Sequence, residues 1–251
     1  MSTRTTLTIT EAQKKNYRDE GFMILERAIP EDTLQMLRDE CYSFIDKEHG
    51  VMDKNNSDVR EMNHRGKRYF IAQRYKESAR LPEFIYGEEM AEICRATLGP
   101  DAYLFYEQWV IKGAEKGMKF GWHQDSGYVG FAHRPYLTCW CALDDMSVAN
   151  GTAYILPYSR AGTRELQPHT REEGSTDRIG YRGSDPGDPV LVPAGSIAVF
   201  SSLTFHRSGY NTTNKMRRVY VVQYVAEPMI NPDGSVQGFA DPFLKGGEIV
   251  R

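Results

Sequence analysis

The stretch IAVFSSLTFHRSGYNTTNKMRRVYVVQYV, residues 197–225, decides the fold. Two runs of β-branched and aromatic residues, 197–200 and 218–225, flank a polar segment that contains Gly209. Apolar runs of this length, bounded by turn-forming residues, are typical of β-strands. The stretch therefore predicts two strands, and the segment between them contains a histidine, His206.

Similar runs recur through the second half of the chain. They are residues 103–111, 137–143, 152–156 and 190–192. The breaks between them contain strong turn signals, such as Asn150-Gly151. Because no helical segments alternate with these strands, the pattern favours an antiparallel barrel or sandwich over a parallel α/β sheet.

The first hundred residues have a different, mostly helical pattern. Apolar residues at helical spacing and terminal capping signals predict three helices and two short strands. The helices are residues 10–20, 30–50 and 82–98, and the strands are residues 22–25 and 69–72. Residues 160–189 are rich in Gly, Pro and charge, which indicates a long lid or binding loop.

The composition of the 251 residues is that of a globular protein, with 40% hydrophobic and 26% charged residues and a formal net charge of −3. This charge balance offers no basic surface to nucleic acid or to an anionic membrane. The sequence has neither a bilayer-length apolar run nor a signal-peptide core within residues 1–10. We therefore expect a cytoplasmic protein with a small-molecule partner and leave its oligomeric state open. Its four cysteines lack metal-site spacing and are expected to be reduced and buried: Cys41, Cys94, Cys139 and Cys141.

Three residues have the chemistry of a metal site. His123 and Asp125 lie two residues apart, so in extended backbone their side chains emerge on one face. His206 lies far enough downstream to return on a neighbouring strand. Two imidazoles and one carboxylate form the facial triad of non-haem Fe(II) oxygenases. Catalytic zinc also takes three protein ligands, and a surface turn at 123–125 with a core histidine at 206 is the alternative.

The segment that follows His206 contains two residues, Arg217 and Ser208, that could bind an anionic cosubstrate. Arg217 begins the last strand, and a planar guanidinium can bind the distal carboxylate of a 2-oxo diacid in bidentate fashion. Ser208, on the same side of the strand as His206, offers a hydroxyl to the same carboxylate. The alternative for Arg217 is a solvated surface cation. Arg218 points the other way, toward solvent or an acidic neighbour.

Taken together, these motifs resemble the phytanoyl-CoA dioxygenase-like family of Fe(II)/2-oxoglutarate oxygenases. The resemblance runs over nearly the whole chain, and its most specific part is the segment from His206 to Arg217. It also includes the helix-to-strand entry at 17–22, the Pro30-Glu31 helix start, Trp122-His123-Gln124-Asp125, the strand with Trp140, Asn150-Gly151 with Pro157, and Gly195 before Phe200.

The resemblance implies a mainly β fold with flanking helices around a double-stranded β-helix, the cupin-like jelly roll. On this basis we expect a single domain over residues 1–251. Residues 1–100 would be the helical flank, 101–228 the jelly-roll core and 229–251 a C-terminal extension.

The resemblance also implies roles for seven residues. His123, Asp125 and His206 would hold Fe(II), and Arg217 and Ser208 would bind the distal carboxylate of 2-oxoglutarate. Trp140 and Gln108 fall where the family lines the cosubstrate pocket. Core packing is the alternative for Trp140, whereas an amide in the apolar run of Gln108 indicates a hydrogen-bonding role.

The implied activity uses Fe(II), 2-oxoglutarate and O2 to hydroxylate or otherwise oxidise a C–H bond of a small organic molecule, with succinate and CO2 as co-products. The alternative is a cupin-like metal-binding protein or isomerase without 2-oxoglutarate turnover, which has no use for Arg217. A zinc hydrolase is a third hypothesis, and it would need a placed general base.

The substrate does not follow from the resemblance. Where the family often has Pro-Gly-Ser-His, this chain has Pro157-Tyr158-Ser159-Arg160, in a loop that leads toward the substrate side. Lys112, Lys116 and Lys119 are interrupted by Glu115, and lysines of such a loop are commonly solvated, so they indicate no site for the phosphates of an acyl-CoA.

Overall fold

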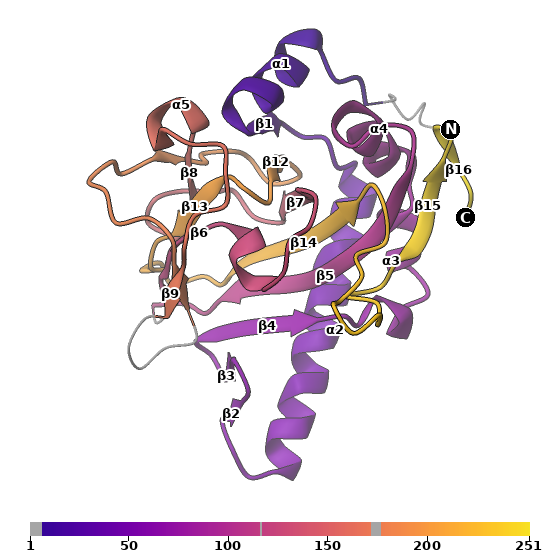
Figure 1. Ribbon diagram of the computed structural model, residues 1–251. Helices are drawn as coiled ribbons and strands as arrows, with labels where there is room; N and C mark the ends of the chain where they lie inside the picture. The colour runs from indigo at the N-terminus through magenta and orange to yellow at the C-terminus, as the bar shows by residue number, and fades with distance from the viewer. Residues whose placement is uncertain (1–6, 116, 172–176) are drawn as a thin grey trace.

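Two antiparallel β-sheets form the centre of the protein (Figure 1). The structure is a computed structural model that describes residues 7–115, 117–171 and 177–251. The larger sheet contains, in spatial order, β1 (Phe22–Leu25), β12 (Ile197–Ser201), β7 (Leu137–Ala142), β14 (Arg217–Val225), β5 (Ala102–Lys112), β4 (Arg68–Ala72), β3 (Asn63–His64) and β2 (Val59–Arg60), with β15 (Asp241–Lys245) and β16 (Glu248–Ile249) joined at β5. The smaller sheet contains β11 (Asp188–Pro189), β8 (Ala153–Leu156), β13 (Phe205–Ser208) and β6 (Phe120–His123).

The remaining elements are short apart from one long helix. The α-helices are α1 (Glu11–Glu20), α2 (Glu31–Lys54), α3 (Leu81–Ile85), α4 (Glu88–Thr97) and α5 (Tyr158–Ala161). The 3-10 helices are η1 (Tyr75–Glu77) and η2 (Asp125–Tyr128), and β9 (Thr170–Arg171) pairs with β10 (Arg178–Ile179). The parts of the predicted N-terminal segment and of the predicted 160–189 loop that fall on residues 1–6 and 172–176 lie outside the described residues.

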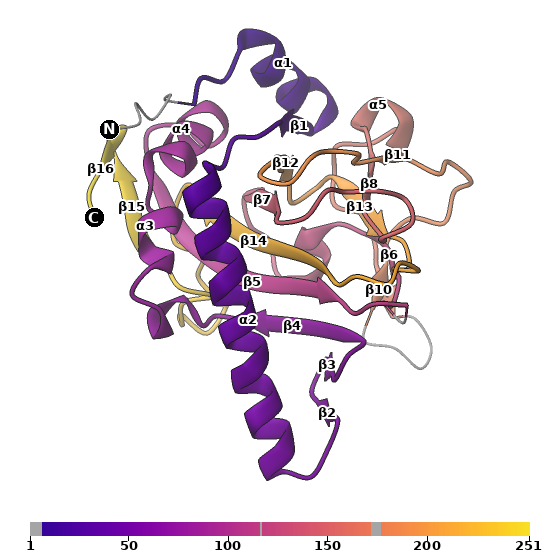
Figure 2. The same ribbon diagram turned by 180° about the vertical axis from the view of Figure 1, so that it is seen from behind.

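The long helix α2 crosses the outer face of the larger sheet (Figure 2). Its apolar stripe includes Leu37 and Phe44, both fully buried. The Phe44 ring lies 6.2 Å from that of Trp109 on β5, which in turn lies 4.1 Å from the ring of Tyr220 on β14. Burying these large side chains under the helix is the main apolar contribution to stability on this side of the sheet.

The inner face of the larger sheet packs against the smaller sheet and forms a second core. Trp140 of β7 and Val221 of β14 belong to the same buried cluster as Ala153 and Ile155 of β8. The central strands are therefore covered on both faces, and all six residues of β7 are buried. This is why the sequence shows continuous apolar runs here rather than a clean alternation. The jelly-roll expectation is confirmed.

Three expected boundaries are wrong. Helix α2 continues past Gly50 to Lys54, because Met52 is fully buried and this burial outweighs the roughly 1 kcal/mol helix penalty of a glycine. The predicted helix 82–98 is divided into α3 and α4, since Gly87 adopts extended backbone and becomes the N-cap of α4. The strand predicted at 190–192 is instead β11, two residues earlier.

Other expectations are confirmed. The four cysteines are free and buried. Arg218 meets an acidic neighbour, with its guanidinium Nη2 2.5 Å from Asp144 Oδ1. Among the described residues, no helix is both long and apolar enough to cross a lipid bilayer.

Gly21 ends α1 and directs the chain into β1. Its φ is +83°, in the left-handed region, and a Cβ there would lie 2.5 Å from both Thr204 Oγ1 and the Tyr158 ring. Gly234 has nearly the same backbone, with φ +85°, but a Cβ added to it would meet no atom within 4 Å. A substitution at Gly234 therefore adds backbone strain alone, whereas the same substitution at Gly21 adds both backbone strain and steric overlap.

We predict that Gly21→Ala lowers the free energy of unfolding by about 2–5 kcal/mol, because it combines left-handed strain with overlap. Gly234→Ala should cost only the strain, about 1–2 kcal/mol. Urea unfolding followed by circular dichroism measures both. Equal losses in the two variants would show that the contact of Gly21 with Thr204 and Tyr158 is not tight.

Candidate metal centre

The pairing of β6 with β13 brings the two histidines together. His123 and His206 are direct cross-strand partners, and their ring centroids lie 4.1 Å apart. Asp125 follows at the start of η2. Its Oδ1 lies 3.6 Å from His123 Nε2 and 3.4 Å from His206 Nε2. One ligand atom from each of the three residues lies within 4.8 Å of the other two, so the set can hold a single metal ion.

Backbone carbonyls orient both imidazoles. His123 Nδ1 donates to the carbonyl of Gly121 at 2.8 Å, and His206 Nδ1 donates to that of Thr204 at 3.1 Å. A carbonyl only accepts, so the proton of each neutral ring lies on Nδ1 and the lone pair of Nε2 faces the centre. Histidines that bind metals usually donate their other ring N–H to a carbonyl or a carboxylate in this way, which fixes the orientation of the ring.

Asp125 is held by the opposite sheet. Its Oδ2 accepts hydrogen bonds from Thr138 Oγ1 at 2.7 Å and from Gln223 Nε2 at 3.0 Å. Thr138 and Gln223 are cross-strand partners on β7 and β14, and they bond each other at 3.0 Å. These bonds leave Oδ1 directed toward the imidazoles. Neither supporting residue was predicted from the sequence, although a polar residue inside each apolar run was the available signal.

The electrostatics of the cluster favour a divalent cation. Burial, and then the neighbouring His206, lowers the pKa of His123 to about 4. Burial opposes ionisation of Asp125, but the two histidines hold its pKa well below the usual range. Asp125 in turn raises the pKa of His206 against the effect of burial. Asp125 is therefore ionised and His123 neutral at neutral pH, as metal binding requires, whereas His206 must give up any proton it carries when a metal binds.

A buried cation lies on the same inner face. Arg217 is 1% exposed, and its Nη1 and Nη2 donate to the carbonyls of Val110 and Gly151, both at 3.3 Å. Its Nε has no acceptor among the described residues, and no carboxylate there forms an ion pair with it. An isolated buried charge is costly, so this arginine fits a site that receives an anionic ligand.

Ser208 lies beside a second buried cation. Lys112, the last residue of β5, donates from Nζ to Ser208 Oγ at 2.9 Å and also to the carbonyl of Gly209. The expectation that Lys112 is a solvated loop lysine is wrong, since it is 3% exposed. Strand β5 extends one residue further than expected and pairs Lys112 with Arg217. Lys119 is exposed, and Lys116 lies outside the described residues.

Trp140 and Gln108 occupy one row of the inner face. Both are cross-strand partners of Val221, from β7 and β5 respectively. The row lies between the pair Thr138–Gln223, which holds Asp125, and Arg217 at the start of β14. Trp140 packs in the inner core with its ring 5.8 Å from the Arg217 guanidinium carbon. The half-buried side-chain amide of Gln108 makes no hydrogen bond within the part of the chain that the structure describes.

Part of the predicted 160–189 loop is anchored behind the centre. Gln124, between two of the cluster residues, is fully buried, and its Nε2 donates to the carbonyl of Glu165 at 2.9 Å. Its Oε1 accepts from Gln167 N at 2.8 Å, and its own backbone N–H donates to His169 Nε2 at 3.0 Å. The segment 165–169 therefore supports the backbone between His123 and Asp125, and the imidazole of His169 provides one of the acceptors.

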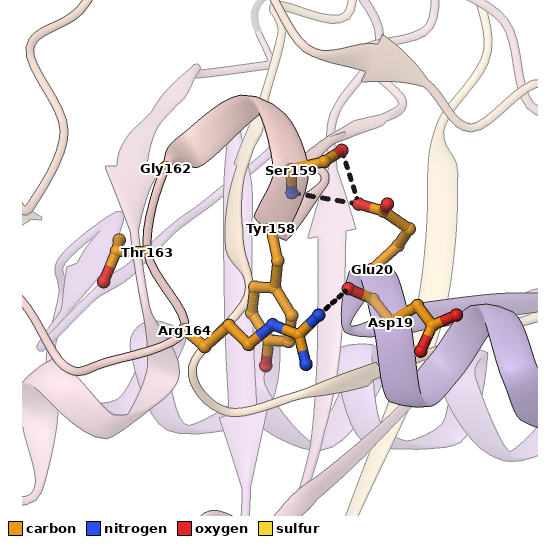
Figure 3. Close-up of a pocket in the computed structure, with 7 residues that line it drawn as sticks. All are labelled: Asp19, Glu20, Tyr158, Ser159, Gly162, Thr163 and Arg164. Carbon is orange, nitrogen blue, oxygen red and sulfur yellow. Dashed lines mark hydrogen bonds between the residues drawn. The ribbon is translucent and has the colours of Figure 1, made fainter.

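A separate surface hollow of about 400 Å³ lies between α1 and α5 (Figure 3). It is lined by Asp19, Glu20, Tyr158, Ser159, Gly162, Thr163 and Arg164. Ser159 donates to the Glu20 carboxylate, and Arg164 donates to the carbonyl of Asp19 at 3.0 Å. These bonds connect α1 to α5 and to the loop that follows α5, and none of the cluster residues lines the hollow.

The sequence model of the phytanoyl-CoA dioxygenase (PhyH) family matches residues 17–219. The chain belongs to this family. It is 23% identical to the peroxisomal phytanoyl-CoA dioxygenase of Mus musculus, over 84% of this chain and 66% of that protein, just under two thirds of its length. It is 24% identical to the ectoine dioxygenase of Bordetella parapertussis, over 88% of this chain and 77% of that one.

A solved structure gives the same fold. EvdO2 from Micromonospora carbonacea var. aurantiaca, complexed with 2-oxoglutarate, superposes with a TM-score of 0.70 at 22% identity. The superposition covers 95% of this chain and 96% of EvdO2. This similarity supports the jelly-roll assignment over almost the full length.

We predict that Gln223→Leu weakens the binding of a divalent metal about 10- to 100-fold, because Asp125 loses a hydrogen bond that orients it. Titration calorimetry with Mn(II) measures the affinity. The matched control is Gln35→Leu, which removes an exposed amide bond to the carboxylate of Asp39 and should leave affinity unchanged. Wild-type affinity in Gln223→Leu would mean that Thr138 alone orients the ligand.

Proposed function

We propose that this protein is an Fe(II)- and 2-oxoglutarate-dependent oxygenase that oxidises a C–H bond of a small organic molecule, with hydroxylation as the default outcome. The observation that carries the proposal is the combination of the His123–Asp125–His206 cluster with the buried guanidinium of Arg217 on the same inner face, which has no ion-pair partner among the described residues. Family membership supports the same reaction class.

The donor set fits iron. His123 and His206 would ligate it through Nε2 and Asp125 through Oδ1, the atoms that the surrounding hydrogen bonds leave free. Two imidazoles and one carboxylate leave further positions of an octahedral ion open to cosubstrate and oxygen. When bound by these residues, iron would supply the oxidising chemistry with 2-oxoglutarate and O2 as co-reactants, and succinate and CO2 would be the co-products.

The protein residues would position the cosubstrate. Arg217 would bind the distal carboxylate through a charge-assisted pair of hydrogen bonds, and Ser208 would donate its hydroxyl to the same group. Trp140 and Gln108 would line the space between this end and the metal, in the row around Val221. Because Arg217 is buried, its attraction for a carboxylate is screened less than that of a surface cation.

A cupin-like binding protein or isomerase needs the metal cluster but not Arg217. A buried arginine without an ionic partner among the described residues favours the oxygenase over this alternative. The catalytic zinc hypothesis likewise gives Arg217 no role.

The substrate side is partly aromatic. Tyr128 is 39% exposed, and its ring lies edge-on to that of His123 at 5.7 Å. Its hydroxyl accepts from the backbone N–H of Arg178 at 3.0 Å, which fixes the ring at the cluster. We therefore propose that Tyr128 contacts the substrate. The relatives are named for phytanoyl-CoA and for ectoine, so their names point to no single substrate for this chain.

We predict that Arg217→Met weakens binding of 2-oxoglutarate by about 100-fold or more, since two charge-assisted hydrogen bonds are lost. The measurement is the weak visible charge-transfer band of anaerobic protein with Fe(II) and 2-oxoglutarate, together with succinate release in air. The adjacent Arg218→Met is the control, because Arg218 pairs with Asp144 and lies on the other face of β14. Wild-type protein with metal bound but no such band would refute the oxygenase and favour the cupin-like alternative.

A further inference from the structure

Three aromatic side chains form a row that leads from β4 to the metal cluster, and we call Phe70, Phe120 and Tyr128 the ring row. The ring centroid of Phe70 on β4 lies 6.0 Å from that of Phe120 on β6. The Phe120 ring lies 6.5 Å from the Tyr128 ring of η2, and the angle between these two rings is only 27°. The row ends at the cluster, because the His123 ring lies 4.5 Å from that of Phe120 and 5.7 Å from that of Tyr128.

The rest of the protein covers the ring row only in part. On the outer face of β5, Trp109 is fully buried, whereas Phe70 and its cross-strand partner Val110 on the inner face are half-buried. Phe120 is half-buried as well, and Tyr128 is 39% exposed. Uncovered aromatic side chains that gather beside a candidate metal centre are typical of a ligand-binding surface.

Arg178 on β10 is fixed at the Tyr128 end of the ring row. Its backbone N–H donates to the Tyr128 hydroxyl at 3.0 Å, and its guanidinium Nη1 donates to the carbonyl of Gly127 at 2.7 Å. The guanidinium carbon lies 5.5 Å from the centroid of the Tyr128 ring. These contacts hold the cation in place before any ligand arrives, so binding costs little side-chain entropy.

A second arginine lies at the other end of the ring row. The guanidinium carbon of Arg68 lies 5.3 Å from the centroid of the Phe70 ring. Neither Arg68 nor Arg178 forms an ion pair with a carboxylate within residues 7–115, 117–171 and 177–251. Burial lowers the pKa of Arg68, and the carboxylate of Asp177 opposes this effect. Even with Asp177 counted in full, the two arginines leave the row positively charged, which favours an anionic occupant.

We propose that the ring row binds a planar aromatic substrate that carries an anionic group, with its ring system against Phe120 and Tyr128 and its anionic group at Arg178. The inference rests on the proposed function and specifies the substrate class of that site. Aromatic rings attract one another beyond the burial of apolar area, so the row favours a flat π-system over an aliphatic chain of equal size. A molecule held there lies beside His123 and therefore beside the metal.

The test compares three probes on Mn(II)-loaded protein with saturating 2-oxoglutarate. They are 2-naphthoate, its saturated counterpart decahydro-2-naphthoate, and the uncharged 2-naphthylmethanol. Titration followed by NMR gives each affinity, and the relaxation of probe protons by Mn(II) shows whether the probe lies beside the metal. Naphthoate should bind beside the metal about 3- to 10-fold more tightly than either other probe, because one of these lacks ring stacking and the other lacks the charge.

Two variants assign the preferences to side chains. Phe120→Leu should remove the preference for naphthoate over its saturated counterpart, and Arg178→Met should remove the preference over the uncharged probe. The control for the first is Phe239→Leu, since this half-buried ring packs against the apolar core that α2 covers. The control for the second is Arg164→Met, since this exposed guanidinium lies 5.8 Å from the Tyr158 ring and donates to a backbone carbonyl. Both controls should keep both preferences.

The outcomes that overturn the inference are distinct. Equal affinity for naphthoate and its saturated counterpart refutes an aromatic substrate, and equal affinity for naphthoate and the uncharged probe refutes an anionic one. Naphthoate that binds without Mn(II)-enhanced relaxation, or that 2-oxoglutarate displaces, occupies another site and also refutes it. The charge-transfer band of Fe(II) with 2-oxoglutarate tests the proposed function separately. Protein that shows this band but no preference for naphthoate loses only the substrate class, whereas protein without the band loses both proposals.

Discussion

The two hydrogen bonds to Asp125 Oδ2 are the interaction on which the rest of the centre depends. Thr138 and Gln223 belong to the larger sheet, whereas Asp125 follows a strand of the smaller one. The bonds therefore tie the two sheets together at the metal cluster. They also direct Oδ1 toward the two imidazoles, which the pairing of β6 with β13 has already aligned.

On the inner face of the larger sheet, polar, apolar and charged side chains occupy different positions along the strands. Gln223 lies near one end of β14 and donates a hydrogen bond to Asp125 of the candidate metal cluster, and Arg217 lies at the other end. Between them Val219 and Val221 belong to the apolar inner core. This spacing suits a ligand that has a metal-chelating end and an anionic end joined by a short carbon chain. The outer face, covered by α2, supplies the apolar burial that stabilises the strands.

Buried charge at Lys112 and Arg217 is costly to the unliganded fold. Burial lowers the pKa of both groups, and the proximity of Arg217 further disfavours the charged form of Lys112. An anionic ligand placed beside these groups would reduce this cost.

Much of this protein follows from sequence alone. The composition of the apolar runs and the turn signals predict an antiparallel β fold. Residue type and spacing single out His123, Asp125, His206 and Arg217 as candidate site residues, because ligand chemistry and strand alternation are local properties. Only the tertiary structure decided the supporting roles of Thr138 and Gln223 and the burial of Lys112. Each of these roles depends on which strands lie opposite one another, and the register of long-range strand pairing is not encoded in the spacing of neighbouring residues. For the same reason Gly50 is read locally as a helix end, although distant packing around Met52 carries α2 beyond it.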